Sequence, residues 1–261
     1  MFDFHLHSRV SCDSQADPWE MVRAAEAAGL KEICFTDHLD YDPKGGKKNI
    51  TFTTESYNDA YDCLHSDRVK IRRGFEFGML PDNVDTFRQD LERRHFDFVI
   101  GSLHYCQNED VYFPPFWENR TVAEAEQAYL EDILSCVRAH DGFDVLGHLT
   151  YLSKALHHPA RRPISLERYG DLVDEILKVL VQKGKGMEMN TSGKGVCGVF
   201  LPEIEFFKRF KELGGEIVTV GSDAHGPDRV GQHTYEAVKL LGDVFGYVCT
   251  FEDRKPIFHK V

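Results

Sequence analysis

The sequence predicts an α/β fold in which seven parallel strands close into a TIM-like barrel, as a single domain over residues 1–261. Short strand-like segments alternate strictly with helical segments, and this alternation is typical of parallel sheets. A chain of 261 residues without a visible linker or internal repeat has the length of one α/β barrel. Residues that can bind metal ions follow most of the expected strands, as they do where active sites form at a barrel mouth.

Seven segments have the short, apolar and often β-branched or aromatic composition of barrel strands. They are residues 2–7, 32–36, 69–77, 96–100, 143–146, 186–190 and 216–221. A strand-like tail follows over residues 247–261.

The helices between these strands are indicated by their ends. Asp17-Pro18 is an N-cap followed by proline at the first helical position, and Gly29 ends the helix 18–28. Thr121, with Glu124 three residues later, forms a capping box at the start of the helix 121–140. The other expected helices are 54–66, 82–94, 165–183, 202–213 and 230–241. Residues 39–53, 105–120, 149–163 and 191–198 are expected to be loops, the first of them a mobile flap.

Composition narrows the function classes. No apolar run is long enough to span a membrane, and the N-terminus lacks the pattern of a secretory signal. The seven cysteines include no Cys-x-x-Cys pair; we interpret Cys34, Cys136 and Cys249, which lie in apolar segments, as reduced core residues of a cytoplasmic protein, and the other four indicate no site. A formal charge of −12 argues against a nucleic-acid partner. It leaves a small anionic substrate possible, because bound metal ions can reverse the local field.

Potential metal ligands occur at the ends of six of the seven expected strands. His5 and His7 point to one face of the first strand, since side chains two apart share a face. In a parallel barrel, the C-terminal ends of all strands surround one mouth. The residues that we expect there are His5, His7, His38, Glu76, His104, His148, Asp223 and His225.

Any one of these histidines could be an ordinary hydrogen-bonded residue, but the set as a whole needs another explanation. Neighbouring cationic imidazoles would repel one another, and buried imidazoles without partners would be costly. Metal ions resolve both difficulties at once.

The motifs around these residues resemble those of the PHP (polymerase and histidinol phosphatase) family over essentially the whole chain. They are His5-Leu6-His7, Thr36-Asp37-His38, Gly74-Phe75-Glu76, Gly101-Ser102-Leu103-His104, Gly147-His148 and Gly221-Ser222-Asp223-Ala224-His225. The chain is most similar to monofunctional histidinol-phosphate phosphatases, as judged from its length, the run Glu188-Met189-Asn190-Thr191-Ser192-Gly193 and the tail Arg254-Lys255-Pro256-Ile257-Phe258.

This resemblance implies a distorted (β/α)7 barrel that holds two to three divalent ions of zinc, manganese or iron. One ion would take His5, His7, Glu76 and Asp223; a second would share Glu76 and add His104 and His148; a third would take Asp13, His38 and His225. Many relatives carry histidine where this chain has Asp13, which is also an acceptable oxygen ligand. Spacing alone does not favour Asp13 over Asp17.

The implied reaction is hydrolysis of a phosphate monoester, most simply L-histidinol phosphate in histidine biosynthesis. Glu76 would bridge two ions, and Asp13 or His38 would assist the leaving group. At least one loop cation among Lys154, Arg161, Arg162 and Lys194 is expected to contact phosphate. Asn190 either binds substrate or fixes its own loop as an Asx-turn.

The organic half of the substrate would carry an amine, which a loop carboxylate could bind. The candidates are Asp40, Asp42, Glu109 and Asp110. Two alternatives stay open: a PHP-type phosphoesterase of other specificity, including a nuclease, and a non-catalytic metal-binding barrel. The sequence does not predict the oligomeric state.

Overall fold

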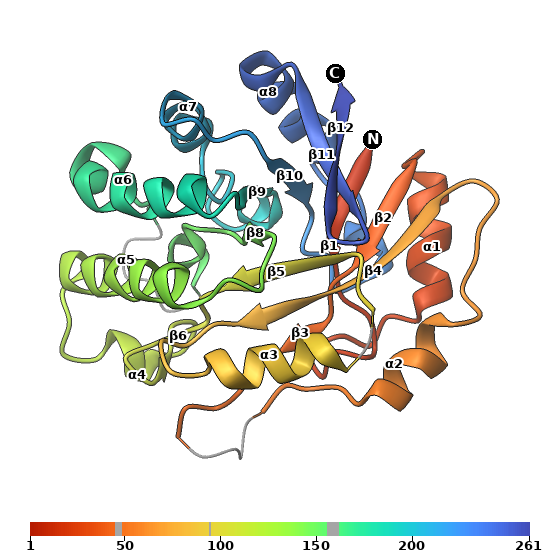
Figure 1. Cartoon of the computed structure of the whole chain (residues 1–261), viewed down its shortest axis with the longest axis horizontal. Coiled ribbons are helices and arrows are strands. Elements are labelled where there is room, and N and C mark those ends of the chain that lie inside the picture. The colour runs from red at the N-terminus through yellow and green to blue at the C-terminus, as the bar shows by residue number, and fades with distance from the viewer. Residues whose placement is uncertain (45–48, 94, 156–161) are drawn as a thin grey trace.

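Seven parallel strands form a barrel sheet in the computed structural model, which describes residues 1–44, 49–93, 95–155 and 162–261 (Figure 1). Each strand pairs with its neighbours in parallel. Their order is β1 (Phe2–Leu6), β2 (Glu32–Phe35), β4 (Lys70–Gly78), β5 (Phe98–Ser102), β8 (Val145–Leu146), β9 (Gly186–Asn190) and β10 (Val218–Gly221). A parallel bridge between Leu6 and Ala224 connects β1 with the residues after β10. The predicted seven-stranded barrel is therefore confirmed as nearly closed.

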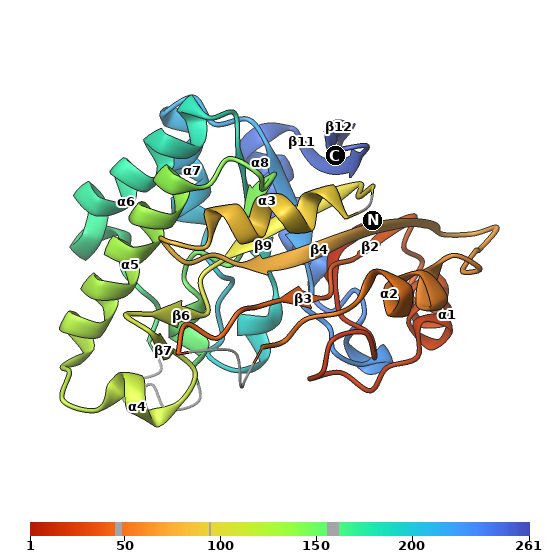
Figure 2. The same ribbon diagram turned by 60° about the horizontal axis from the view of Figure 1, so that its bottom comes forward.

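Helices cover the outside of this sheet (Figures 1 and 2). Their starts follow the predicted chemistry: Asp17 accepts a hydrogen bond from the Trp19 amide, and Thr121 and Glu124 form a reciprocal capping box. The main helices are α1 (Pro18–Ala27), α2 (Thr54–Tyr61), α3 (Val84–Glu92), α5 (Val122–Ala139), α6 (Leu166–Gln182), α7 (Ile204–Glu212) and α8 (Thr234–Phe245).

Several segments that we expected to be loops contain regular structure. The strand β3 (His38–Leu39) pairs with β4, so His38 is held at the sheet instead of starting a loop. Residues 105–120 form the hairpin of β6 (Tyr105–Cys106) and β7 (Glu109–Asp110), followed by α4 (Pro114–Trp117). Short 3₁₀ helices occur as η1 (Tyr151–Lys154), η2 (Ser192–Gly195) and η3 (Pro227–Arg229).

The start of the last helix was predicted wrongly. We expected residue 230, but α8 begins at Thr234. Gly231 and His233 have positive φ angles of 71° and 59°, which are incompatible with a right-handed helix. Part of the expected flap (45–48) and part of the basic loop (156–161) lie outside the described residues. Within the described part of the flap, a bridge pairs Asp40 with Ile50.

The hydrophobic core has two layers. The larger layer lies between the sheet and the helices. A smaller cluster fills the N-terminal end of the barrel, which we call the floor: Phe4, Cys34, Phe98, Ile100, Val145 and Phe251. Phe251 comes from β11 (Tyr247–Glu252), which pairs antiparallel with β12 (Lys255–Lys260), so the predicted strand-like tail forms a hairpin against the floor.

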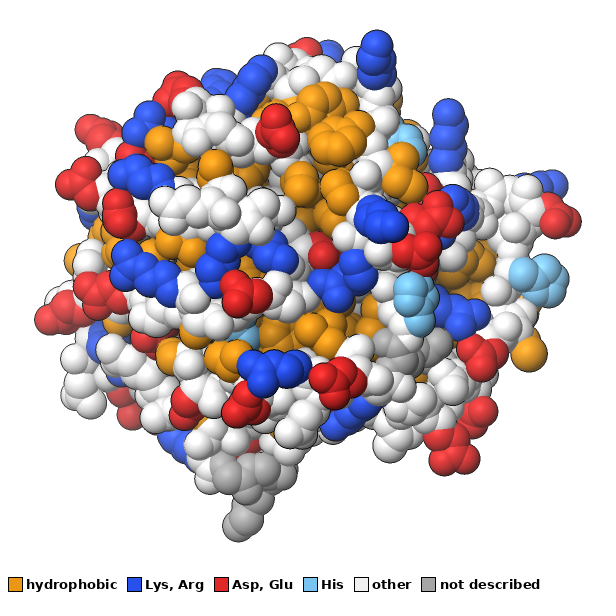
Figure 3. Space-filling view, viewed as in Figure 1, with side chains coloured by type: hydrophobic (Ala, Val, Ile, Leu, Met, Phe, Trp, Pro, Cys, Tyr) orange, Lys and Arg blue, Asp and Glu red, His pale blue; other side chains and the backbone are white. Residues whose placement is uncertain are grey.

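The surface carries both signs of charge. Figure 3 shows basic and acidic side chains interspersed over one face, with apolar side chains between them. Across the described ranges, no helix is both long and apolar enough to cross a membrane.

Candidate metal centre and substrate pocket

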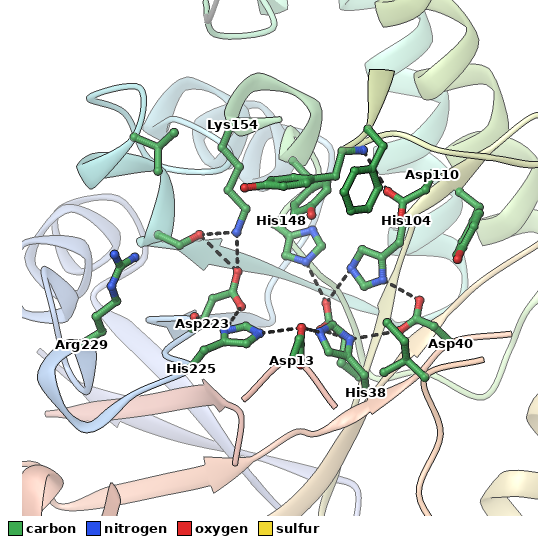
Figure 4. Close-up of a pocket in the computed structure, with 18 of the residues that line it drawn as sticks. Asp13, His38, Asp40, His104, Asp110, His148, Lys154, Asp223, His225 and Arg229 are labelled. Carbon is green, nitrogen blue, oxygen red and sulfur yellow. Dashed lines mark hydrogen bonds and ion pairs between the residues drawn. The ribbon is translucent and has the colours of Figure 1, made fainter. Parts of the chain in front are cut away.

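The predicted metal-binding residues come together at the C-terminal ends of the strands, which we call the mouth. A cavity of about 590 Å³ opens there. Most of the predicted ligands line it, whereas His5 and His7 are fully buried and do not (Figure 4). The predicted ligands that line the cavity are Asp13, His38, Glu76, His104, His148, Asp223 and His225.

Glu76, near the end of β4, lies at the centre of this cluster and is 1% exposed. Burial by itself would raise its pKa, but the charges of nearby histidines outweigh burial and hold the pKa well below its usual range. Its two oxygens contact histidine nitrogens on different sides. Oε2 lies 3.1 Å from His5 Nε2, 3.5 Å from His7 Nε2 and 3.2 Å from His38 Nδ1, and Oε1 lies 2.7 Å from His148 Nε2 and 3.3 Å from His104 Nε2.

Asp223 approaches the same histidines from the residues after β10. Its Oδ1 lies 3.4 Å from His7 Nε2 and 3.8 Å from His5 Nε2. Its φ angle of 55° places it in the left-handed region, which aspartate tolerates better than most residues. Its other oxygen, Oδ2, accepts a hydrogen bond of 2.6 Å from Lys154 Nζ.

Asp13 lies at the outer side of the cluster. Its Oδ2 is 3.3 Å from His38 Nε2 and 3.1 Å from His225 Nε2. Although burial alone would raise the pKa of Asp13, these two histidines lower it. Asp17, which spacing could not separate from Asp13, instead caps α1 and pairs with Arg9.

The donor set fits divalent metal ions. His5 Nε2, His7 Nε2 and His38 Nδ1 are buried and have no hydrogen-bond partner among the described residues. Ligand atoms lie within 4.8 Å of one another in the groups His5–His7–Asp223, His5–Glu76–His148 and His7–His38–His225. Unsatisfied nitrogen lone pairs beside carboxylate oxygens are the arrangement that a bound cation would satisfy.

The sequence analysis missed two buried carboxylates behind these histidines. Glu188 Oε1 lies 2.6 Å from His5 Nδ1. Asp40 lies 3.0 Å from His38 Nδ1 and 2.7 Å from His104 Nδ1, and it was considered only as an amine partner. The spacing of two residues between His38 and Asp40 was a signal for Asp40, whereas no local pattern indicates the contact of Glu188 with His5. Both carboxylates can orient the imidazoles that they contact.

The candidate phosphate-binding cations have different environments. Lys154 lines the cavity, whereas Arg162 pairs with Glu126 at 3.1 Å and Lys194 with Glu236 at 3.0 Å, and neither of those two lines it. Arg161 lies outside the described residues. Arg229, which the sequence analysis did not consider, is an exposed residue of η3 that lines the cavity.

Asn190 is fully buried and is not among the cavity-lining residues. Its Oδ1 accepts hydrogen bonds from the Ser192 amide at 3.0 Å and from Ser192 Oγ at 2.6 Å. A side-chain oxygen bonded to the amide two residues later is the geometry of an Asx-turn. Asn190 was expected either to bind substrate or to fix its own loop, and this contact favours the second role.

The candidate amine partners are separated by the fold. Asp110 and Asp40 line the cavity, whereas Asp42 and Glu109 line only a smaller neighbouring pocket of about 100 Å³, which Asp110 also borders. Figure 4 places Asp110 on the His104 side of the cavity and Arg229 on the Asp223 side. The aromatic residues Tyr105, Tyr112 and Phe113 line the cavity together with Asp110.

Comparison with known proteins identifies the family. The PHP domain profile matches residues 3–192. The probable histidinol-phosphatase of Clostridium acetobutylicum is 32% identical over 92% of each chain, and the histidinol-phosphatase of Lactococcus lactis is 30% identical over 97% of this chain and 95% of that protein.

Solved structures agree with this identification. The Lactococcus lactis histidinol phosphate phosphatase, solved with zinc, L-histidinol and phosphate, superposes with a TM-score of 0.88 at 29% identity and 98% coverage of both chains. A putative histidinol phosphatase from Listeria monocytogenes shares the fold, with a TM-score of 0.75 at 18% identity over 90% of this chain and 99% of that one. The predicted resemblance is confirmed: this chain belongs to the PHP domain family.

Proposed function

We propose that this protein is a metal-dependent phosphoric monoester hydrolase that converts L-histidinol phosphate to L-histidinol and phosphate, a step of histidine biosynthesis. One observation carries the proposal: five histidines from four strand ends converge on the two oxygens of Glu76 at a cavity mouth. The relatives named histidinol-phosphatase, which align over nearly the whole chain, support this substrate.

We assign the metal ligands as the resemblance implies. The first ion would bind His5, His7, Glu76 and Asp223, the second Glu76, His104 and His148, and the third Asp13, His38 and His225. The contacts of Glu76 with both histidine groups support its role as the shared ligand. When bound, two to three ions of zinc, manganese or iron would supply positive charge for the phosphoryl oxygens and activate water.

Lys154 is our candidate for binding the phosphate. Its ammonium group lies at the cavity wall, where it donates to Asp223 Oδ2 at 2.6 Å and Ser192 Oγ at 2.7 Å. These two contacts hold Nζ in place, and an ammonium has a third hydrogen to donate to a phosphate oxygen. Arg229, on the same side of the cavity, is a second candidate cation.

Asp13 or His38 is our candidate for assisting the leaving alkoxide. His38 Nε2 lies 3.3 Å from Asp13 Oδ2, and both residues line the cavity. Both residues are also assigned to the third ion, so either one would act as the acid only where that ion leaves its acidic group free.

Asp110 is our candidate for binding the amine of the substrate. Of the four carboxylates considered, Asp40 already contacts His38 and His104, while Asp42 and Glu109 line the neighbouring pocket but not the main cavity, and Asp110 borders both. Asp110 lines the main cavity beside Tyr105, Tyr112 and Phe113. A carboxylate with aromatic rings around it suits an organic group that is both cationic and planar.

We propose further that residues 193–261 belong to the same catalytic unit as the family-matched residues 3–192. Asp223 and His225 contribute to the mouth, and Phe251 packs in the floor. We also propose a cytoplasmic location, for which the seven free thiols are the supporting feature.

Two measurements test the function: metal analysis of the purified protein, and a panel of histidinol phosphate, other small monoesters and single-stranded oligonucleotide. We expect bound zinc, manganese or iron, and the highest kcat/KM for histidinol phosphate. Faster oligonucleotide cleavage would favour the nuclease alternative. Metal binding without any turnover would favour the non-catalytic barrel.

A further inference from the structure

Glu188 is a buried carboxylate that lies outside the predicted ligand set. It sits in the middle of β9 and is 1% exposed. Its Oε1 lies 2.6 Å from His5 Nδ1, although 183 residues separate the two along the chain. Its Oε2 accepts hydrogen bonds from the His148 backbone amide at 2.9 Å and from Asn190 Nδ2 at 3.3 Å. One carboxylate thus contacts two predicted metal ligands that come from β1 and from the end of β8.

The neighbouring strands leave room for this carboxylate. A Cβ atom at Gly221 would lie 2.4 Å from Glu188 Oε1 and 2.3 Å from His5 Cβ. This explains why position 221, the first residue of the motif at the end of β10, is a glycine: any side chain there would displace the Glu188–His5 pair. Gly147 is different: a Cβ there would clash with Ser102 Oγ at 2.4 Å and Ile100 Cγ2 at 2.6 Å, and it would make only an ordinary contact of 3.6 Å with Glu188 Oε2.

The contact with Glu188 selects one tautomer of His5. A neutral imidazole carries its proton on one nitrogen and a lone pair on the other. If Nδ1–H donates to Glu188, Nε2 keeps its lone pair, and this is the nitrogen that lies 3.1 Å from Glu76 Oε2 without a hydrogen-bond partner in the described chain. At His148, the backbone contact holds the residue whose Nε2 lies 2.7 Å from Glu76 Oε1.

We propose that Glu188 is a positioning residue of the metal centre: it holds His5 as the Nδ1–H tautomer, fixes the backbone of His148, and so directs both rings toward Glu76. This inference rests on the metal centre of the proposed function. It assigns Glu188 no contact with the substrate.

The substitution Glu188→Gln distinguishes this role from simple filling of space. A glutamine has nearly the same volume, but only one end of its amide accepts hydrogen bonds, while the other donates. Glu188 accepts at both ends, from His5 and from the His148 amide. Glutamine must therefore place its NH₂ against one of these donors, and the geometry of one ligand is lost.

The chain offers a matched control in Glu32→Gln. Glu32 is also a buried glutamate of a barrel strand, 5% exposed, but it lies at the floor and pairs with Arg72 at 2.7 Å. Both substitutions remove one buried negative charge. Only Glu188→Gln is expected to alter the mouth.

Zinc affinity, measured by competition with a chromophoric chelator, tests the inference on the whole protein. We expect Glu188→Gln to weaken zinc binding by about 10- to 100-fold, the usual effect of losing a carboxylate behind a histidine ligand. Glu32→Gln should match the wild type. Equal zinc affinity of Glu188→Gln and wild type would overturn the inference, and so would an equal loss in Glu32→Gln. If the wild type binds no zinc, manganese or iron, the proposed function fails as well, so the two failures are distinguishable.

A second measurement needs only the wild type and stands even if Glu188→Gln does not fold. Long-range ¹H–¹⁵N spectra of histidine-labelled, zinc-loaded protein report which ring nitrogen carries the proton. We expect His5 to be protonated at Nδ1. Protonation of His5 at Nε2 would refute the role of Glu188.

Discussion

The mouth and the floor of the barrel both bury ionisable side chains, but they neutralise them differently. At the floor, carboxylates meet arginines of the same chain. Arg72 donates to Glu32 at 2.7 Å and to Glu252 at 2.7 Å, and Arg254 donates to both oxygens of Asp144. Charges at the floor are thus compensated within the chain, close to an apolar cluster closed by Phe251.

At the mouth, carboxylates meet histidines. Burial alone would lower the pKa of His104, but Asp40 and Glu76 raise it to about 10, whereas burial lowers the pKa of His148. Several imidazole nitrogens there have no hydrogen-bond partner among the described residues. An arginine carries a permanent charge, whereas a neutral imidazole has a lone pair that can bind a metal ion.

This difference suggests how one barrel separates stability from chemistry. The floor pairs its carboxylates with arginines, which carry their charge without an external partner, although Arg72 Nη2 has no hydrogen-bond partner among the described residues. The mouth holds donor atoms that become fully satisfied when cations bind. Substitutions at the floor should therefore change the stability of the fold, whereas substitutions at the mouth should change metal binding and turnover.

The largest effect is expected at the mouth, from Glu76→Gln. Glu76 is the proposed bridge between two ions, and an amide is a poor bridging ligand. We expect kcat to fall about 10³-fold, equivalent to about 4 kcal/mol of transition-state stabilisation. Asp13→Asn, at the outer side of the cluster, should cost about tenfold. Steady-state kinetics at saturating metal compares the two variants, and equal losses would argue against the bridge.

At the floor, Arg72→Met should destabilise the fold without changing the metal site. The substitution leaves Glu32, whose side chain is 7% exposed, without its 2.7 Å partner. Breaking a buried pair in this way costs about 3–5 kcal/mol, or a melting temperature lower by roughly 10 °C. Denaturant unfolding and zinc titration of the same samples check both halves of the prediction.

The control for this floor variant is the double substitution Arg72→Met/Glu32→Met. Replacing both partners of a buried pair by apolar residues of similar size is often nearly neutral. Most of the lost stability should therefore return. If Arg72→Met weakened zinc binding by a free energy as large as its loss in free energy of unfolding, the separation of the two ends would be contradicted.

A smaller effect is expected from Asp110→Asn at the rim of the mouth. If Asp110 binds the substrate amine, its loss should cost about 1–3 kcal/mol, or roughly 5- to 150-fold in kcat/KM for L-histidinol phosphate. The analogue that lacks the α-amino group should be unaffected. Similar kcat/KM values of the wild type for the two substrates would remove the claim of amine recognition and leave the metallophosphatase proposal intact.

The smallest effect concerns the exposed edge of the floor. Hydrogen bonds from Arg72 and Lys70 lower the pKa of Glu252 from 4.5 to about 2. Because the folded-state pKa lies below the unfolded one, this contribution to stability is complete above pH 4.5 and is lost as pH falls toward 2. Glu252→Gln should therefore lose less stability than the wild type between about pH 6 and about pH 3 in urea unfolding. An unchanged pH profile would show that Glu252 is not coupled to folding.

The sequence by itself determined the barrel and the gathering of eight potential ligands at its mouth. Strand and helix periodicity are local properties, and they place His5 and His7 on one face and Glu76 near the end of β4. A closed parallel barrel brings the C-terminal ends of all its strands together. The topology alone therefore predicted that these ligands converge, before any interatomic distance was known. The helix caps Asp17 and Thr121 could also be predicted from the sequence, because the free backbone amides at the start of a helix are bonded by side chains only a few residues away.

Only the tertiary structure decided which side chains support or surround that mouth. Glu188 of β9 and His5 of β1 meet past Gly221 of the intervening strand β10, 183 residues apart along the chain, and no local pattern marks such a pair. Likewise, the sequence does not distinguish Arg162 from Lys154, since both are cations of the same loop. In the folded protein, Arg162 forms an ion pair with Glu126 on α5, whereas Lys154 forms one with Asp223 at the cavity. The physical reason is the same in both cases: the partner of a side chain depends on how distant elements pack in three dimensions, whereas sequence periodicity reports only the face on which that side chain lies.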